Sequence, residues 1–309
     1  MLSSISQSNK VSLNNKYIPS HDENQYLSLI NQILKQGTSE TGRNGNVLSV
    51  FGAAMHFDLY SNVLPLLTTK KLAWKTCLKE LLWFIRGQTD NELLRAQKVH
   101  IWDGNGSREF LDSRGLQHLK EHDLGPVYGH QWRHFNAEYT DCHTDYEGQG
   151  VDQLAYIINA LKDPAQRNSR RLVMSAWNPC QNDKMALPPC HILCQFKVDH
   201  NNFLHCSLYM RSNDIMLGCP FNIASYAFLT HLIAHHCDLK AGELMYFVGD
   251  AHIYENHIEG AKEQVFREPW VFPTLNIKNK YENINDYNVD DFEVINYESD
   301  PPIKMEMVA

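Results

Sequence analysis

The chain has 309 residues, of which 43% are hydrophobic and 21% are charged, as in ordinary soluble globular proteins. Its formal net charge of −8 argues against nucleic acid or an anionic membrane surface as the main partner. No apolar run approaches the roughly 20 residues that cross a bilayer. No secretory leader precedes the eight cysteines, so we expect reduced thiols and a cytoplasmic location.

The cysteines and histidines show no complete pattern for a metal site. Two clusters stand out, Cys190-His191 with Cys194 and the run 235–237, but each lacks a second spaced pair that would complete a tetrahedral site. We therefore expect no metal.

Residues 1–23 are rich in Ser, Asn, Gln and Lys without periodicity, which predicts a flexible extension before one folded domain at 24–309. From Asn24 the apolar spacing predicts a helix that ends before Gly37. A turn over 41–46 and a strand over 47–51 are expected next. Arg43 in that turn can either fold over a phosphate or belong to an ordinary surface turn.

The leucines of 75–86 recur on one face and predict a helix that Gly87 ends. Glu80 lies among these apolar residues. It either belongs to the solvent-facing stripe of the helix or points into a pocket. In a pocket, burial would raise its pKa and let it transfer protons near neutral pH.

The segment 123–134 mixes glycine, proline, aromatic and polar residues in a way that neither helix nor strand patterning explains. The stretches 103–114 and 136–150 on either side are predicted to be surface insertions. A helix is expected over 151–161 and a strand over 172–177. Arg170 and Arg171 precede that strand. They share one anion only if both lie in the turn before it, and otherwise form a solvated pair.

The two alternating runs 191–198 and 203–210 predict a β-hairpin, because the four residues between them are turn formers. If the turn centres between His200 and Asn201, Cys190 faces Arg211 across the ladder. The guanidinium favours the thiolate, the form of the side chain that attacks carbon. Cys190 is therefore the candidate nucleophile, and the alternative is one of several buried, inert cysteines.

A long helix that is apolar nearly all round is predicted from Gly218 to about His236, and such a helix should be buried. Asn222 near its start can donate and accept through one amide, which suits the N–H and carbonyl of uracil, or it can cap its own helix. After a strand over 244–248, His252 and Tyr254 would share a face and direct two polar tips toward a ligand or toward solvent.

Four of these segments closely resemble motifs of the thymidylate synthases: 124–135, 185–191, 211–222 and 249–254. The likeness runs from about residue 24 to 309, and the 105–113 insertion and the 303–307 ending are similar to the eukaryotic branch. The resemblance implies an α+β fold, a large twisted mixed β-sheet flanked by helices, which packs against its twin in a homodimer.

The resemblance also implies a methyltransferase reaction. It converts dUMP to dTMP with methylenetetrahydrofolate as the donor of the one-carbon unit and of hydride, through a covalent adduct of Cys190. Glu80 would organise proton transfers through water, and Tyr128 would help to remove a proton from the ring. The other residues implied in catalysis are Arg211, His191 and Asn222.

Binding roles follow from the same resemblance. The residues implied for dUMP are Arg43, Arg211, Ser212, Asp214, Asn222, His252 and Tyr254, with Arg170 and Arg171 from the other subunit. The residues implied for the folate are Lys70, Ile101, Trp102, Asn105, Asp214, Leu217, Gly218, Phe221 and, in a terminal lid, Val308.

Two departures from the family pattern affect these assignments. In the family, one loop usually begins with an arginine. The corresponding loop here runs from Glu40 to Val47, so its arginine has either moved to Arg43 or been replaced by Glu40. Met210 stands before Arg211 where the family usually has glutamine.

Three alternatives remain at this point. A pyrimidine nucleotide hydroxymethylase would use the same adduct but end with capture of water. A catalytically inactive relative would bind only nucleotide or folate. A cysteine hydrolase is disfavoured because no His–Asn or His–Asp pair is identifiable beside Cys190.

Overall fold

A computed structural model describes residues 21–42 and 45–307. The flexible extension predicted over 1–23 therefore lies almost entirely outside the described residues, as do Arg43 and Val308. The strands are β1 (Thr38–Gly42), β2 (Gly45–Asp58), β3 (Val173–Ser175), β4 (His191–Val198), β5 (Phe203–Asp214), β6 (Lys240–Tyr254), β7 (Thr274–Ile277) and β8 (Phe292–Ile295).

The α-helices are α1 (Glu23–Gln36), α2 (Trp74–Ile85), α3 (Glu92–Arg95), α4 (Asp103–Gly106), α5 (Arg108–Ser113), α6 (Tyr128–His134), α7 (Gln153–Lys162), α8 (Gly218–His236) and α9 (Ile258–Gln264). Short 3-10 helices occupy Tyr60–Asn62, Asn182–Lys184, Glu255–His257, Ile284–Asp286 and Val289–Asp291.

The core of the molecule is a six-stranded sheet in the order β1-β2-β6-β5-β4-β3. Strands β5 and β6 are parallel and α8 connects them, whereas the other neighbouring pairs are antiparallel. A parallel pair needs such a crossover connection, and a helix is the usual one. The predicted α+β fold with a large mixed sheet is confirmed.

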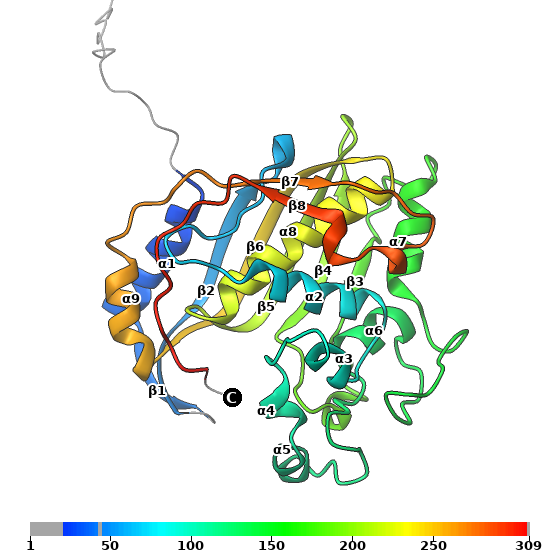
Figure 1. Ribbon diagram of the computed structural model, residues 1–309, viewed down its shortest axis with the longest axis horizontal. Helices are drawn as coiled ribbons and strands as arrows, with labels where there is room; N and C mark the ends of the chain where they lie inside the picture. Colours follow the sequence, from blue (N-terminus) through cyan, green and yellow to red (C-terminus); the bar gives the residue numbers. More distant parts are fainter. Residues whose placement is uncertain (1–20, 43–44, 308–309) are drawn as a thin grey trace, which may run out of the picture.

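Helix α8 lies across one face of the sheet, as Figure 1 shows. Nearly all of its side chains are buried, as its all-round apolar pattern predicts. On β4 the buried residues alternate with exposed ones. Because successive side chains of a strand point to opposite faces, the sheet has one face under helices and a second face that residues 21–42 and 45–307 leave open.

Several elements differ from the sequence-based expectations in extent. Strand β2 continues to Asp58, beyond the predicted 47–51, because it pairs with β6 along most of its length. Residues 38–42 form an edge strand where a loop was expected. The predicted surface insertion at 103–114 contains α4 and α5, and Leu111 anchors it in the core.

The segment 123–134 has a regular part that its composition did not indicate. Helix α6 begins at Tyr128, two residues after Pro126. Gly125 has a φ of +72°, and a Cβ there would lie 2.3 Å from the carbonyl oxygen of Lys184. At Gly129 a Cβ would lie 2.5 Å from the carbonyl oxygen of Gln88. Both glycines therefore allow backbone segments to pass closer than a side chain would permit.

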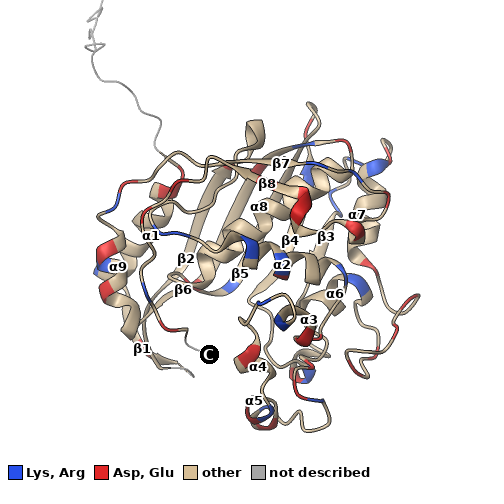
Figure 2. Ribbon diagram, in the orientation of Figure 1, with Lys and Arg blue, Asp and Glu red and all other residues tan. Residues whose placement is uncertain are grey.

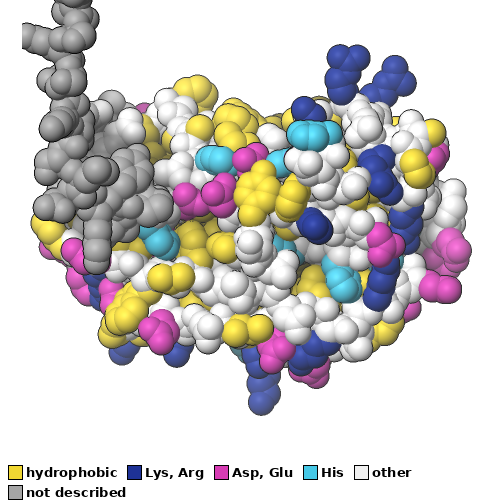
Figure 3. Space-filling model, turned by 90° about the horizontal axis from the view of Figure 1, so that it is seen from above, with side chains coloured by type: hydrophobic (Ala, Val, Ile, Leu, Met, Phe, Trp, Pro, Cys, Tyr) yellow, Lys and Arg dark blue, Asp and Glu magenta, His cyan; other side chains and the backbone are white. Residues whose placement is uncertain are grey.

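Charged residues are interspersed over the described surface. Figure 2 shows that both acidic and basic residues occur on the helices and loops. On the face in Figure 3, basic side chains lie next to acidic and histidine side chains, so positive charge is not continuous there. Among the described residues, none of the helices combines the length and apolar character that a bilayer crossing requires.

A buried carboxylate joins the first helix to the segment before α2. Glu23 is fully buried, and its carboxylate accepts hydrogen bonds from the backbone N–H and the hydroxyl of both Thr68 and Thr69, at 2.6–3.0 Å. These four donors satisfy an ionised side chain that would otherwise be costly to bury. They also fix the chain immediately before Lys70.

We predict that Glu23→Gln lowers the free energy of unfolding by about 2–3 kcal/mol, because an amide oxygen cannot accept all four donors. Urea denaturation followed by circular dichroism measures the change. The matched control is Glu121→Gln on the surface, for which we expect less than about 0.5 kcal/mol. Equal effects of the two changes would contradict this assignment of Glu23.

Candidate active site

Cys190 and Arg211 face each other at the end of the β4–β5 pair. Arg211 N donates to Cys190 O at 2.9 Å, and Arg211 Nη2 lies 3.8 Å from Cys190 Sγ. The guanidinium also donates from Nε to Pro189 O at 2.7 Å and from Nη2 to Pro188 O at 3.0 Å. The carbonyls of the two prolines thus hold the cation beside the sulfur, as the sequence predicted for this pair.

The register that led to this pairing was nevertheless wrong over most of the hairpin. Val198 pairs with Leu204, one position beyond what a turn centred between His200 and Asn201 would give. Asp199 N donates to Phe203 O at 3.0 Å, so the loop closed by this pair has three residues and ends in Asn202, whose φ is +62°. An irregularity between His191 and Leu193 shifts the register back by one position. The two register shifts are each one residue in opposite directions, so they cancel at Cys190 and Arg211, where the ladder ends.

Tyr128 and His191 form a stacked pair against the nucleophile's backbone. Their ring centroids are 3.8 Å apart with an interplanar angle of 7°, and the Tyr128 hydroxyl accepts from Cys190 N at 2.8 Å. His191 Nδ1 shares a hydrogen bond of 2.8 Å with the hydroxyl of Tyr226. Burial lowers the pKa of His191 to about 3, so its ring is neutral at physiological pH.

The hydroxyl of Tyr128 retains its proton at neutral pH. Burial raises its pKa well above the usual value, and the nearby Cys190 thiol raises it further. Tyr128 is the first residue of α6, which places its ring between the helix and the start of β4. The structure thus places the Tyr128 hydroxyl 2.8 Å from the backbone nitrogen of Cys190.

Glu80 on α2 is half-buried and bonded to an aromatic residue of the facing segment. Trp102 Nε1 donates to Glu80 Oε1 at 2.7 Å. Burial raises the pKa of Glu80 to about 7, although the bond from Trp102 opposes the rise. Of the two positions that periodicity allowed for Glu80, the bond to Trp102 and the desolvation therefore exclude the solvent-facing stripe. Ile101 and Asn105, also half-buried, flank Trp102.

Asn222 lies in the first turns of α8 within a polar chain. Asn213 Nδ2 donates to Asn222 Oδ1 at 3.1 Å, and the hydroxyl of Tyr246 donates to Asn213 Oδ1 at 2.7 Å. These bonds orient the Asn222 amide, which does not cap its own helix. Asn213 and Tyr246, which are both buried, were not singled out from the sequence.

Four of the residues predicted to bind folate, Asp214, Leu217, Gly218 and Phe221, lie at or just before the start of α8. Asp214 Oδ1 accepts from Met216 N at 2.9 Å and from Leu217 N at 3.3 Å, which fixes the turn that leads to Gly218. Cys77 Sγ contacts the carbonyl oxygen of Phe221 at 3.3 Å. Since Cys77 precedes Glu80 by about one helical turn on α2, this contact brings Phe221 to the same side of the helix.

Lys70 lies beneath this turn. It is 6% exposed and donates from Nζ to Met216 O. Burial lowers its pKa to about 8, while Asp214 acts in the opposite direction. An anionic ligand tail reaches this amine only if the side chain leaves the carbonyl of Met216, so the described conformation does not present Lys70 on the surface.

His252 and Tyr254 lie near the end of β6, two residues apart as predicted. Their ring centroids are 5.3 Å apart, and His252 Nδ1 lies 2.8 Å from Asp250 Oδ1. Asp250 pairs with Ser212 on the neighbouring β5. Ser212 and the His252–Tyr254 pair therefore belong to the same end of the sheet as Arg211.

Arg170 and Arg171 are not brought to the thiol of their own chain. Both are exposed and precede β3. Arg170 O accepts from Gln195 Nε2 at 3.2 Å. Gln195 lies five residues beyond Cys190, which corresponds to about 16 Å along an extended strand.

Trp177 and Tyr226 also belong to the site but were not singled out from the sequence. The Arg211 guanidinium lies 5.6 Å from the centroid of the Trp177 ring, which adds a cation–π contact to the two proline carbonyls. Tyr226 follows Asn222 by four residues on α8, and that spacing places both on one face of a helix. This spacing was the available signal for Tyr226.

Comparison with known proteins gives a consistent assignment. The thymidylate synthase family profile matches residues 24–309. The bifunctional dihydrofolate reductase-thymidylate synthase of Leishmania amazonensis is 55% identical over 297 residues, 95% of this chain and 57% of that protein. The bifunctional protein of Paramecium tetraurelia is 51% identical over 97% of this chain and 64% of its own length.

The thymidylate synthase of Homo sapiens is 53% identical over 292 residues, which are 94% of this chain and 92% of that protein. The chain thus spans little more than half of the first relative named and most of the human one. Because the profile covers residues 24–309 and the human enzyme is 53% identical over 92% of its own length, the chain belongs to the thymidylate synthase family.

Proposed function

We propose that the protein catalyses the reductive methylation of dUMP to dTMP, with methylenetetrahydrofolate as co-substrate. The observation that carries the proposal is the position of Arg211 Nη2, 3.8 Å from Cys190 Sγ, while Cys190 N is held by Tyr128. A guanidinium at that distance favours the thiolate. The bond from Cys190 N to Tyr128 fixes the backbone that carries the sulfur.

In the proposed reaction the Cys190 sulfur bonds to carbon six of the pyrimidine, and carbon five becomes nucleophilic. The folate would supply the one-carbon unit and, later, a hydride that completes the methyl group. Tyr128 lies beside the sulfur, and its protonated hydroxyl would help to remove the proton that carbon five loses by relaying it to water. When the sulfur leaves carbon six, the thiolate is restored beside Arg211. His191, which is neutral, would support the Tyr128 ring by stacking.

Glu80 is suited to pass protons to and from the ring through water. A carboxyl with a pKa near 7 exists in both protonation states at physiological pH, which is the optimum for general acid–base transfer. The bond from Trp102 holds one oxygen, so the second oxygen is available to a water molecule. Trp102 would also form an aromatic wall for the folate.

Substrate recognition is proposed from the same arrangement. Asn222 would bind the adjacent N–H and carbonyl of uracil, an assignment that disfavours a cytosine nucleotide. Arg211 and Ser212 would hold the phosphate, and His252 with Tyr254 the sugar hydroxyl. The other proposed phosphate ligands are Arg43 and, from the second subunit, Arg170 and Arg171. The proposed folate ligands are Lys70, Ile101, Trp102, Asn105, Asp214, Leu217, Gly218, Phe221 and Val308.

A homodimer is proposed because the open face of the sheet carries a row of apolar side chains. Leu193, Tyr209 and Phe247 are neighbours across β4, β5 and β6 and are 37–38% exposed. Exposed apolar rows on a sheet are typical of interaction surfaces. A second copy on this face would bring its Arg170 and Arg171 toward the phosphate site, which explains why neither lies near its own thiol.

The compartment is proposed to be the cytoplasm, where thiols remain reduced. All eight cysteines are free in the structure. A nucleophilic Cys190 also requires a reducing environment, because an oxidised sulfur cannot add to a pyrimidine.

The reaction is tested by mixing the protein with dUMP and methylenetetrahydrofolate and measuring both products. Equal amounts of dTMP and dihydrofolate support the proposal. Hydroxymethyl-dUMP with tetrahydrofolate would identify the hydroxymethylase instead. Binding of dUMP without either product would identify the inactive relative.

We predict that Cys190→Ser reduces turnover at least about a thousandfold while the Kd for dUMP changes only a few fold. The hydroxyl is a much weaker nucleophile, but the phosphate ligands remain. Steady-state assays and calorimetry measure the two quantities. Cys180→Ser, at an exposed free cysteine, is the matched control and should behave as the wild type. Turnover that survives in Cys190→Ser would exclude the covalent route.

We predict that Glu80→Gln reduces kcat by about a hundredfold or more, because an amide cannot exchange protons. The same change should alter the pH dependence of stability. The folded-state pKa of about 7 exceeds the usual value of 4.5, so the carboxyl stabilises the fold below pH 4.5 and loses this contribution as pH rises to about 7.

Between pH 4.5 and 7 the free energy of unfolding of the wild type should therefore fall by about 1–3 kcal/mol relative to that of Glu80→Gln. Above pH 7 the difference between the two proteins should stay constant. Urea denaturation at a series of pH values measures this difference, and Glu109→Gln at an exposed site serves as the control. A constant difference between Glu80→Gln and the wild type across this range would show that the carboxyl is not desolvated.

We predict that Leu193→Asp converts the proposed dimer to a monomer, because a carboxylate on this face would be buried without a partner. Light scattering coupled to gel filtration measures the mass. The matched control is Phe266→Asp, at an apolar residue that is 88% exposed and lies outside the row. A dimer that persists in Leu193→Asp would move the interface elsewhere. The monomer should also show a raised KM for dUMP.

A further inference from the structure

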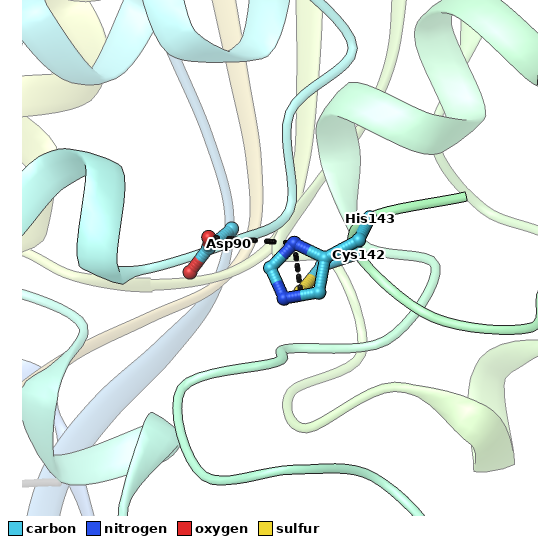
Figure 4. Close-up of side chains that lie close together, drawn as sticks. All are labelled: Asp90, Cys142 and His143. Atoms are coloured by element: carbon cyan, nitrogen blue, oxygen red, sulfur yellow. Dashed lines mark hydrogen bonds and ion pairs between the residues drawn. The ribbon is translucent and has the colours of Figure 1, made fainter. Parts of the chain in front are cut away.

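Three potential metal ligands outside the active site lie together near the surface. Asp90 lies between α2 and α3, and Cys142 and His143 belong to the loop 136–150. Figure 4 shows the His143 ring beside the Cys142 sulfur, with the Asp90 carboxylate directed toward the ring. His143 Nδ1 lies 4.0 Å from Asp90 Oδ2 and 3.9 Å from Cys142 Sγ. All three ligand atoms are within 4.8 Å of one another.

These spacings are close to those of a tetrahedral zinc site. With bonds of about 2.3 Å to sulfur and about 2.0–2.1 Å to nitrogen and oxygen, the ligand atoms of such a site lie about 3.3–3.6 Å apart. The Cys142–His143 and His143–Asp90 distances exceed this range by only about 0.3–0.7 Å. Cys142 Sγ lies 3.8 Å from Nε2 and 3.9 Å from Nδ1 of His143, so the sulfur faces the imidazole ring, and the ring must rotate to direct a nitrogen lone pair at a shared ion.

Hydrogen bonds hold both segments in place without using the ligand atoms. Asp123, which pairs with Asp90 in a β-bridge, accepts from Cys142 N at 3.0 Å and from the Tyr139 hydroxyl at 2.6 Å. Asp90 Oδ1 accepts from Glu92 N at 2.9 Å, so its Oδ2 faces His143. Outer contacts of this kind orient the ligands of protein metal sites.

The electrostatics around the thiol favour a cation. The carboxylates of Asp123, Asp90 and Asp141 lie near the Cys142 thiol. His143 is the neighbouring side chain that can carry a positive charge opposite to that of these carboxylates. Three carboxylates around one thiol leave local negative charge that a divalent ion would neutralise.

We propose that Cys142, His143 and Asp90 bind one zinc-type divalent cation, with water as the fourth ligand. The donor set of one sulfur, one nitrogen and one oxygen fits zinc better than magnesium or calcium, which prefer oxygen alone. Binding breaks the S–H bond of Cys142 and releases its proton to solvent, and the sulfur electron pair bonds to the metal. The ion would fasten the loop 136–150 to the segment at Asp90.

This inference revises the expectation of no metal. The ligands come from positions 90 and 142–143, and only the fold brings them together, so no spacing in the sequence could reveal them. The site uses none of the residues assigned to dUMP or folate. Its test can therefore fail while the proposed reaction stands, and the reverse is also possible.

The test is titration of the full chain with Zn²⁺ by calorimetry and with Co²⁺ by absorption spectroscopy, both in the Cys190→Ser background to silence the reactive thiol. We expect one ion per chain, a thiolate-to-cobalt charge-transfer band, release of about one proton per Zn²⁺, and tighter binding as pH rises. Zn²⁺ should also raise the midpoint of thermal unfolding.

Adding Cys142→Ser, His143→Ala or Asp90→Asn should each weaken binding by about tenfold or more, and Cys142→Ser should abolish the cobalt band. Two controls are matched: Cys180→Ser removes an exposed thiol, and His56→Gln alters a second cluster formed with Asp58 and Glu243. Neither should affect binding. The proposal is overturned if Zn²⁺ does not bind, if binding survives Cys142→Ser, or if His56→Gln removes it.

Discussion

The last hydrogen bond of the β4–β5 ladder, from Arg211 N to Cys190 O, determines where the groups around the thiol can lie. It joins the residue before β4 to a residue inside β5, so the guanidinium and the sulfur belong to one rigid unit. The two proline carbonyls then hold the Arg211 side chain. Pro188 and Pro189 have no N–H to donate, so this segment cannot extend strand β4. Their carbonyl oxygens accept hydrogen bonds from the Arg211 side chain instead.

Loss of hydration sets the charge states in the pocket. Burial raises the pKa of Glu80 and lowers those of His191 and Lys70, and all three shifts favour the uncharged form. Arg211 keeps its charge because a guanidinium does not deprotonate in proteins. At neutral pH His191 is therefore uncharged and Glu80 is only partly ionised, whereas Lys70, with a pKa of about 8, keeps most of its positive charge. In such a setting a negative sulfur is the natural counterion of Arg211, and Glu80 competes with it less than an ionised carboxylate would.

The sequence was informative wherever a pattern is local. The long buried helix, the hairpin and the helix ended by Gly87 follow from periodicity and turn residues, and the structure contains all three. The Cys190–Arg211 pair was predicted correctly from an incorrect register, because a three-residue loop and an irregularity near His191 shift the ladder in opposite directions. No local rule gives the position of such an irregularity. The Asn213–Tyr246 contact was equally inaccessible, since it depends on which strands become neighbours.

Met210 shows how a departure from the family pattern fits the observed geometry. It is fully buried and pairs with His191 across the ladder, so the two side chains lie on the same face of the sheet. A thioether there offers at most weak hydrogen bonding, and the imidazole bonds to Tyr226 instead. An apolar neighbour also increases the desolvation that keeps His191 uncharged. Met210 therefore supports the neutral ring that stacks on Tyr128, and through it the position of the hydroxyl that holds Cys190.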